Sequence, residues 1–235
     1  LGDVYKRQVL YYAMSVWGGE QTCGIGVATA NSPQGPFTDH GKMFRSNEIG
    51  VQNSIDPSLL QYEGRNYLVW GSFRGIYVIE LTADGLSIMS GAKKKRIAGT
   101  AFEAVYIHKH GDYYYMFASI GSCCQGVKST YKVVVGRSKK VWGPYKDKTG
   151  KPMLKNGYSL VIGANDHFVG NGHGSQIIQD DAGQDWLLYH GFSRSTPENG
   201  RILLLDQIKW DQEGWPYVEG GSPSYETQKA PVFNN

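Results

Sequence analysis

The sequence predicts an all-β protein, and three features of the chain support this fold class. Short runs rich in Tyr, Val, Ile, Trp and Leu alternate with Gly, Asn and Asp, which is typical of strands joined by turns. Almost no stretch has the periodicity of a helix. The same succession of four short strands returns at intervals of about 40–70 residues, which indicates a β-propeller, because each blade buries its apolar faces against its neighbours.

Each copy of the repeat begins with two strands joined by a polar turn. This plan covers residues 56–72, 103–119 and 173–190, and residues 9–15 match the second strand of an earlier copy. A third and a fourth strand are expected in each copy at residues 23–30 and 35–37, 76–81 and 86–89, 131–138 and 143–145, and 201–210 and 215–218.

The chain therefore holds three full copies and most of a fourth. No linker divides them, so we expect a single domain over residues 9–235. An irregular sandwich or barrel is the alternative, but it does not explain why polar residues recur at the same place in each copy.

Composition excludes several classes of function. The net charge is +3, and the basic residues are dispersed apart from residues 93–96, where we expect a solvated turn and no nucleic-acid footprint. The longest apolar runs, such as residues 202–205, fall far short of the ~20 residues that a membrane helix needs. Three cysteines make no disulfide framework, and the adjacent Cys123 and Cys124 lack further ligands at metal-binding spacing.

Residues 1–8 need separate treatment. Residues 3–8 can be back-translated to a DNA sequence that resembles the end of a transposon adapter used to make sequencing libraries. We therefore interpret residues 1–8 as adapter-derived and exclude them from the fold. A genuine basic N-terminus is the alternative. A signal peptide is not observable in this sequence.

Polar residues stand at the start of the first strand in three copies, as Asp56, Glu103 and His173. The first strands of a propeller line its central channel, so we expect these side chains to converge on one axial cavity. A carboxylic acid that protonates a leaving oxygen, with a second carboxylate nearby, is the arrangement that acid–base hydrolysis requires. The alternative is a turn role, since Asp-Pro commonly starts turns.

Six motifs make a resemblance specific: residues 53–58 (NSIDPS), 71–76 (GSFRGI), 102–106 (FEAVY), 121–126 (GSCCQG), 172–175 (GHGS) and 210–216 (WDQEGWP). In this order, from Val9 to about Val218, they resemble the family-43 glycoside hydrolases, and most of all the endo-acting α-1,5-L-arabinanases. The resemblance implies a five-bladed β-propeller, here missing most of its first blade, and an inverting mechanism. It also implies an arabinan or arabino-oligosaccharide substrate and a secreted or periplasmic monomer.

Other functions remain open at this point. An exo-acting α-L-arabinofuranosidase or β-xylosidase of the same family differs in the shape of the channel mouth, which the sequence does not reveal. A non-catalytic sugar-binding propeller needs neither Glu103 nor Asp56, and a protein-interaction propeller usually has more regular repeats.

The resemblance assigns roles to the two carboxylic acids. Glu103 is the general acid, and Asp56 is the third carboxylate, which orients the acid and keeps it protonated near neutral pH. The family's general base is another Asp, on the first strand of the first blade. No Asp lies between Gln8 and Asp39, which we expect in a turn, and Asp3 belongs to the suspected adapter. We therefore expect the base to be absent and this chain not to hydrolyse arabinan at a normal rate.

The resemblance also suggests binding residues. His173 faces a metal ion in the axial channel, expected to be Ca²⁺, or hydrogen-bonds the catalytic carboxylates without metal. Arg201 is expected to bind sugar hydroxyls, and a clamp on the catalytic carboxylates or a surface role is the alternative. Asn53 and Ser72 are expected to donate hydrogen bonds to the sugar. Phe73, Trp17 and Trp70 are candidates for stacking on sugar rings, with a core position as the alternative. The loop of Cys123 and Cys124 is expected to shape the substrate cleft. For Trp17 and Trp70 the core position is the expected one, and a structural role in the fold, turns or surface is expected for His190, His40, His108, His110 and His167.

Overall fold

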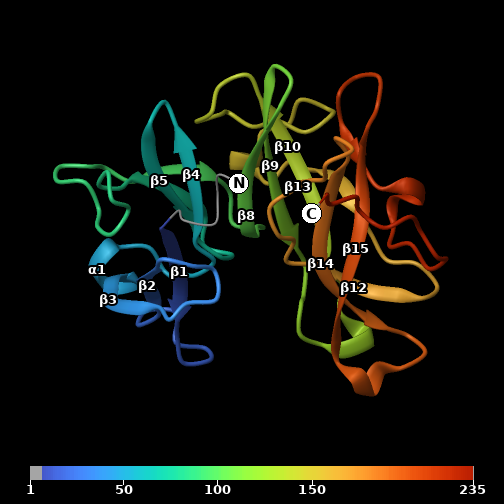
Figure 1. Ribbon diagram of the computed structural model, residues 1–235, viewed down its shortest axis with the longest axis horizontal. Helices are drawn as coiled ribbons and strands as arrows, with labels where there is room; N and C mark the ends of the chain where they lie inside the picture. The colour runs from blue at the N-terminus through green and yellow to red at the C-terminus, as the bar shows by residue number, and fades with distance from the viewer. Residues whose placement is uncertain (1–6, 235) are drawn as a thin grey trace. The chain divides into compact units, whose positions relative to one another are not determined.

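The computed structural model describes Arg7–Asn234, and the chain divides into two compact units, Leu1–Thr100 and Ala101–Asn235. Each unit contains two antiparallel sheets (Figure 1). Helical structure in the described residues is limited to one turn of α-helix, α1 (Ser46–Ile49), and the 3-10 turns η1 (Gly126–Lys128), η2 (Met153–Lys155), η3 (Pro197–Asn199) and η4 (Glu219–Gly221). The all-β prediction is confirmed. No helix between Arg7 and Asn234 is long and apolar enough to cross a membrane.

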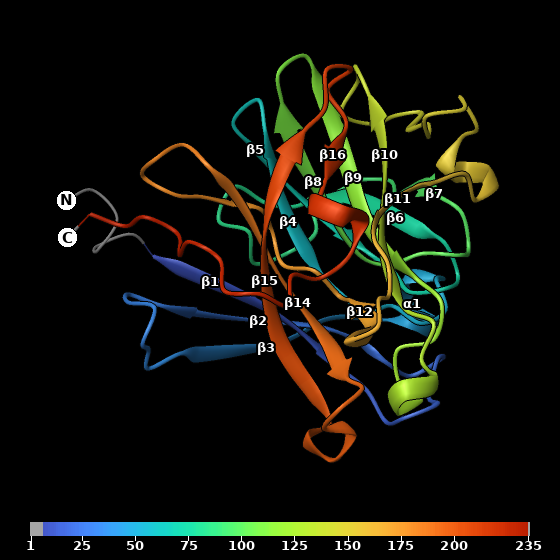
Figure 2. The ribbon, with the colours of Figure 1, turned by 90° about the vertical axis from the view of Figure 1, so that its right-hand side faces the viewer.

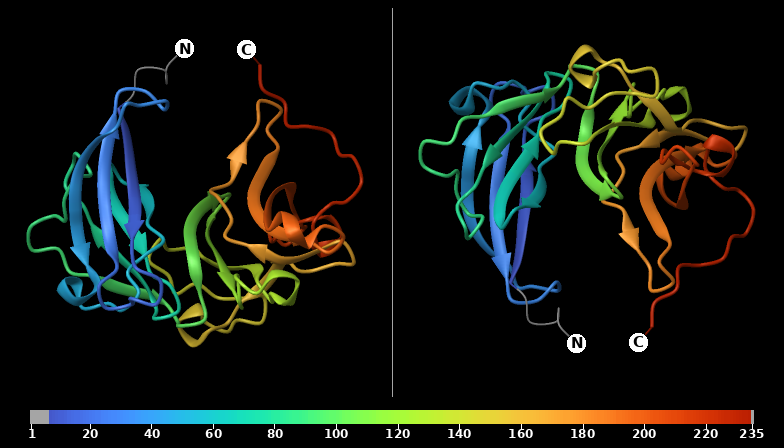
Figure 3. Two further views of the ribbon diagram at one scale, coloured as in Figure 1. Left: turned by 90° about the horizontal axis from the view of Figure 1, so that it is seen from below. Right: turned by 90° about the horizontal axis from the view of Figure 1, so that it is seen from above.

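The first unit holds a three-stranded and a four-stranded sheet. The first sheet has the order β1 (Gln8–Met14), β2 (Gly24–Ala30), β3 (Thr38–Arg45), and its strands lie side by side in Figure 3. The second sheet has the order β4 (Ser58–Tyr62), β5 (Arg65–Trp70), β6 (Ile76–Glu80), β7 (Lys95–Ala98). Neighbouring strands follow one another in the sequence, as in a propeller blade.

Trp70 is a fully buried residue of the core of this unit. It has no solvent exposure, and its ring lies 5.3 Å from that of Phe44 on β3 and 5.9 Å from that of Tyr77 on β6. Its indole N–H donates a hydrogen bond of 3.1 Å to the Ser54 hydroxyl, so burial leaves no polar atom unpaired. The expected core position of Trp70 is confirmed, whereas Trp17 is 89% exposed and its expected core position is wrong.

The second unit contains the other two sheets. The third sheet has the order β11 (Ser159–Ile162), β10 (Lys132–Ser138), β9 (Tyr113–Ile120), β8 (Glu103–His110). The fourth has the order β12 (Phe168–Gly172), β14 (Asp185–Ser193), β15 (Arg201–Trp210), β16 (Pro216–Tyr217), and β13 (Ile178–Gln179) also pairs with β14. The long strands β14 and β15 are seen together in Figure 2. One apolar cluster, including Tyr115, Val135, Tyr189 and Trp215, joins the two sheets.

The predicted repeat is confirmed as three copies with four or more strands and one with three. The fourth strands were predicted too early in two copies, because residues 86–89 and 143–145 belong to loops that form only isolated bridges, Leu81 with Ile88 and Arg137 with Lys146. The true fourth strands are β7 and β11.

Three smaller expectations also need correction. Residues 35–37 form no strand and directly precede β3, so Asp39 lies in that strand and not in a turn. Residues 93–96 are only partly a loop, since Lys95 and Arg96 pair in β7. The strand β12, which was not predicted, precedes His173, because its glycines weaken the apolar pattern.

We expect Trp70→Ala to destabilise the chain by about 3–5 kcal/mol, since it removes a fully buried aromatic side chain and leaves a cavity between the two sheets of the first unit. Urea unfolding followed by circular dichroism measures the loss. Trp17→Ala is the matched control and should change the free energy of unfolding by no more than about 0.5 kcal/mol. Equal effects of the two substitutions would contradict the role assigned to Trp70.

Candidate active site

Glu103 occupies the first position of β8 and is only 7% exposed. The pairing of β8 with β9 shifts between Glu103 and Tyr106, so that three steps along β8 match two steps along β9. This β-bulge contains Ala104, whose φ of +51° is uncommon for a residue other than glycine. Bulges re-aim side chains at the ends of strands, and this one sets the direction of the Glu103 carboxyl group.

The Tyr131 hydroxyl donates a hydrogen bond of 2.5 Å to Oε1 of Glu103. Tyr131 is 1% exposed and directly precedes β10, the second neighbour of β8 in the sheet. A buried phenol has few rotamers, so this bond holds the carboxyl group in one place before any substrate arrives. Sequence reasoning missed Tyr131, because a Tyr before a strand is indistinguishable from a core aromatic residue.

Gly172 makes room for the Tyr131 ring. A Cβ atom on Gly172 would lie 2.3 Å from a carbon of that ring, so no other residue fits here without moving Tyr131. The next residue, His173, donates its backbone N–H to the Ser119 hydroxyl at 2.8 Å, and its Nδ1 lies 3.5 Å from the Tyr131 hydroxyl oxygen. The glycine–histidine motif therefore supports the partner of Glu103 and brings His173 to the same group.

His190 belongs to this group as well, which the sequence did not predict. It lies on β14 directly opposite Gly172, and its ring centroid is 5.8 Å from that of Tyr131 and 6.2 Å from that of His173. Within the described residues, both of its ring nitrogens are buried without a hydrogen-bond partner. The pairing of β12 with β14 is the signal that would have revealed it.

Burial lowers the pKa of His190 to about 4, with further contributions from the charges of Arg201 and His173. Its imidazole is therefore neutral at neutral pH. Arg201 begins β15 as an exposed residue and pairs with Phe192, two residues after His190 on β14. The cluster combines a carboxyl group, a phenol and two imidazoles.

The other predicted residues lie in the first unit. The Asn53 side-chain amide donates to the Ser72 carbonyl at 3.1 Å and to the Ser72 hydroxyl at 3.0 Å, which ties the first motif to the second. Ser72 is 1% exposed, so it fixes this pair of loops. Phe73, which follows Ser72, and Asp56, three residues after Asn53, are half-buried.

Backbone strain gathers at the predicted site residues. Among the described residues, five of the seven non-glycine residues with positive φ lie in the motifs: Asn53, Asp56, Phe73, Ala104 and His173. Their φ values lie between +51° and +56°. Such conformations cost free energy and persist where the surrounding structure enforces them, which is common at functional sites.

The structure brings some of the predicted residues together within the second unit. Glu103 and His173 meet through Tyr131 in the second unit. Asp56 precedes β4 by two residues in the first unit, so its convergence with Glu103 stays a prediction. His173 follows β12, and the expectation that it begins the first strand of its copy is wrong.

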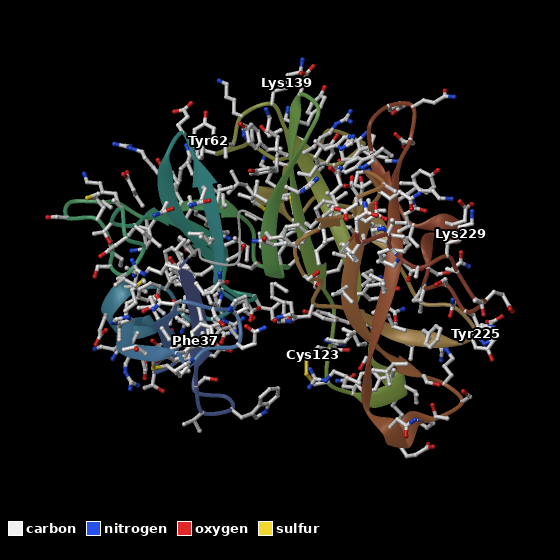
Figure 4. The ribbon with its side chains drawn as sticks, viewed as in Figure 1. Phe37, Tyr62, Cys123, Lys139, Tyr225 and Lys229 are labelled. Carbon is white, nitrogen blue, oxygen red and sulfur yellow. A yellow bond between two sulfur atoms is a disulfide. The ribbon has the colours of Figure 1, made fainter. Side chains whose placement is uncertain are left out.

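Cys123 and Cys124 form a disulfide between adjacent residues in the loop after β9, where Cys123 is labelled in Figure 4. The loop is closed by hydrogen bonds between Ser122 and Thr130. It leaves β9 just after Ser119, the residue that pairs with Glu103. The proposed effect of this loop on the substrate cleft stays a prediction.

Comparison with known proteins identifies relatives of the chain. The family model described as Glycosyl hydrolases family 43 matches residues 3–216, a range that includes part of the suspected adapter. The extracellular exo-α-(1→5)-L-arabinofuranosidase ArbA of Cellvibrio japonicus is 38% identical over 92% of this chain and 69% of its own length. The extracellular endo-α-(1→5)-L-arabinanase 1 of Bacillus subtilis is 36% identical over 88% of this chain and 64% of its own length.

Solved structures of arabinanases also match the chain. The α-L-arabinanase of Cellvibrio cellulosa complexed with arabinohexaose matches 92% of this chain and 74% of that chain, with a TM-score of 0.83 and 34% identity. The native Bacillus subtilis arabinanase Arb43A matches 91% of this chain and 74% of that chain, with a TM-score of 0.75 and 32% identity. The four sheets are therefore blades of the β-propeller type found in the arabinanases.

We expect protonation of His190 to destabilise the chain in acid. The unfolded histidine binds a proton near pH 6.5, whereas the folded one does so only near pH 4. Its contribution to stability is therefore present above about pH 6.5 and is lost as the pH falls toward about 4. His190→Phe removes this dependence, so urea midpoints measured between pH 7 and pH 4.5 with EDTA should fall less steeply than in the wild type.

His167→Phe is the control for this measurement, since His167 is an exposed histidine that stacks on Tyr225. It should retain the wild-type slope. Parallel curves for the wild type and His190→Phe would show that His190 is not the group responsible.

Proposed function

Because the chain belongs to glycosyl hydrolase family 43, we propose that the enzyme it represents hydrolyses α-1,5-linked L-arabinan with inversion at the anomeric carbon. The observation that carries this proposal is the buried Glu103, held by Tyr131 in the family's Phe-Glu-Ala motif. The named activities of the two relatives, an arabinanase and an arabinofuranosidase, support the substrate class.

Glu103 acts as the general acid and transfers its proton to the glycosidic oxygen as the bond to the sugar breaks. Tyr131 is a positioning residue that keeps the carboxyl group oriented. A carboxylate base activates water on the opposite face of the sugar, at a carboxyl separation of about 6.5–9.5 Å. Asp56 is assigned as the third carboxylate of the family's set.

Sugar-binding roles are also part of the proposal. Arg201, Asn53 and Ser72 are assigned to sugar hydroxyls, and Phe73 to stacking. For Asn53 and Ser72 the observed hydrogen bonds to each other favour a supporting role, in which they hold the loop that presents Phe73.

The complete fold is proposed to have five blades. The chain spans about two thirds of the length of the curated relatives named above, and its first sheet has three strands where the others have at least four. In this proposal, the first strand of the first blade carries the general base. Residues 1–6, which include Asp3, lie outside the described residues.

An exo-acting arabinofuranosidase is the second candidate, and the name of the Cellvibrio japonicus relative favours it. We give priority to endo action because the resemblance in the six motifs is greatest for the endo-acting branch. The products of debranched arabinan distinguish the two, since endo action releases a range of oligosaccharides from the start. The extracellular location of both named relatives supports secretion, and a monomer fits the proposal.

Ca²⁺ at His173 is a further part of the proposal. The donors in the second unit fit Ca²⁺ poorly, because Ca²⁺ prefers oxygen ligands and His173 offers nitrogen. Within the described residues, the one group of three potential ligands close enough to share an ion lies elsewhere. Water would complete most of the shell, so no chemical step is assigned to the ion.

We expect removal of Ca²⁺ with EGTA to lower the activity of a chain extended to five blades, and added Ca²⁺ to restore it. The measurement is reducing-sugar release from debranched arabinan, and Mg²⁺ serves as the control ion. An unchanged rate after EGTA dialysis would remove Ca²⁺ from the proposal.

We expect Glu103→Gln in the extended chain to lower reducing-sugar release by about 10²–10⁴-fold, because the amide cannot protonate the leaving oxygen. The unextended chain is assayed beside it, because the comparison tests whether the proposed first strand supplies the base that activates water. Gln184→Glu, on an exposed turn, is a control that should retain the rate.

The possible outcomes separate two ideas. A Glu103→Gln enzyme that keeps its rate would refute the role of Glu103. Equal rates for the extended and unextended chains would show instead that another residue supplies the base, while leaving the role of Glu103 intact.

A further inference from the structure

Two histidines and an aspartate meet between the third and fourth sheets, away from the candidate active site. His108 and His110 are two residues apart on β8, so their side chains leave the same face of the strand. Asp185 begins β14. One potential ligand atom from each lies within 4.8 Å of the others, and Nδ1 of His110 is 3.9 Å from Oδ2 of Asp185. The expectation that these histidines are isolated turn or surface residues is therefore wrong.

The carboxylate of Asp185 lacks a permanent positive partner. The residue is 6% exposed. Its Oδ2 accepts a hydrogen bond of 2.7 Å from the Trp210 indole, and its Oδ1 accepts one of 3.2 Å from the Gln179 amide. Within Arg7–Asn234, no lysine or arginine pairs with it, and its one ion-pair contact there is with His110. A buried negative charge is costly unless a cation compensates it.

The two imidazoles are held in place and are open to metal. His110 stacks on the Trp210 ring with centroids 3.7 Å apart and planes 7° apart, and its side chain is 40% exposed. His108 is half-buried, its ring lies 6.1 Å from that of Trp210, and a neutral imidazole has a lone pair to donate to a metal ion. Solvent can reach the group on the side of His110.

We propose that His108, His110 and Asp185 bind a divalent transition-metal ion, of which Zn²⁺ is the probe. Two imidazole nitrogens and one carboxylate oxygen suit zinc, nickel or copper better than calcium or magnesium. Ligands at zinc distances stand about 3.4 Å apart in a tetrahedron, so side-chain shifts of about 1 Å close the site. Water takes the fourth position, and the hydrogen bonds of Trp210 and Gln179 orient Asp185 as an outer shell.

The site would stabilise the second unit without joining the chemistry. It links β8 of the third sheet to β14 of the fourth. Glu103 and His108 pair with Ser119 and Tyr115, which lie four positions apart on β9, about 13 Å at the usual rise of a strand. Bound metal should therefore raise the melting temperature, because it binds the folded chain in preference to the unfolded one.

The test titrates the tag-free 235-residue chain, first dialysed against EDTA, with Zn²⁺ by calorimetry. We expect one site that is weakened about 100-fold or more by His110→Gln and by Asp185→Asn. Asp185→Asn keeps the acceptor for Trp210, which guards against simple misfolding. His167→Gln and His173→Gln are matched controls and should retain the site. Titration with Co²⁺ should produce visible absorption bands typical of nitrogen and oxygen ligands in the wild type. The same titration of His110→Gln and of Asp185→Asn should not produce them.

Each result bears on the proposal. Loss of the Zn²⁺ site and of its increase in melting temperature in both ligand variants, with retention in both controls, supports it. Absence of Zn²⁺ binding to the wild type, or the same isotherm in wild type and His110→Gln, overturns it. Loss of the site in His173→Gln alone would also overturn it, since the ion would then lie in the candidate active site.

Discussion

The hydrogen bond from Tyr131 to Glu103 is the interaction on which the rest of the candidate site depends. It requires a buried tyrosine ring to approach a backbone closely, and Gly172 is the residue that permits this approach. It also requires the Glu103 carboxyl group to leave the strand in the correct direction, which the bulge at Ala104 provides. A sequence motif that contains the glycine and the histidine thus serves an acid that lies 69 positions earlier in the chain.

The imidazole beside this bond carries no charge at neutral pH. The ring of His190 stacks on that of Tyr131, and its pKa is lowered to about 4 by burial, with further contributions from Arg201 and His173. A neutral, poorly hydrated surrounding strengthens hydrogen bonds to a carboxyl group and favours its orientation over its solvation. The cost is a histidine whose two ring nitrogens are buried without partners, together with strained backbone at Ala104 and His173. Such costs are accepted at functional sites when packing elsewhere offsets them.

Much of the fold was predictable because strand repeats are a property of local pattern. The strand at Arg201–Trp210 was predicted at its true ends, and the count of repeats was correct. The fourth strands were misplaced because β7 and β11 follow long loops, and their apolar runs are too short to stand out from those loops. Glu103 and His173 could be found from motifs, whereas Tyr131 and His190 could not, since their roles arise only when β10, β12 and β14 are packed together.

The bulge in β8 also explains why one strand serves two different clusters. In a regular strand, Glu103 would share a face with Val105, and Tyr106 would lie on the other face. The extra residue makes Glu103 pair with Ser119 and Tyr106 pair with Phe117, and these two partners are two positions apart on β9. Glu103 therefore joins the face of Tyr106, His108 and His110, the face that carries the acid at one end and the two imidazoles at the other. A single inserted residue places both groups against the fourth sheet, where His173 and Asp185 provide their respective partners.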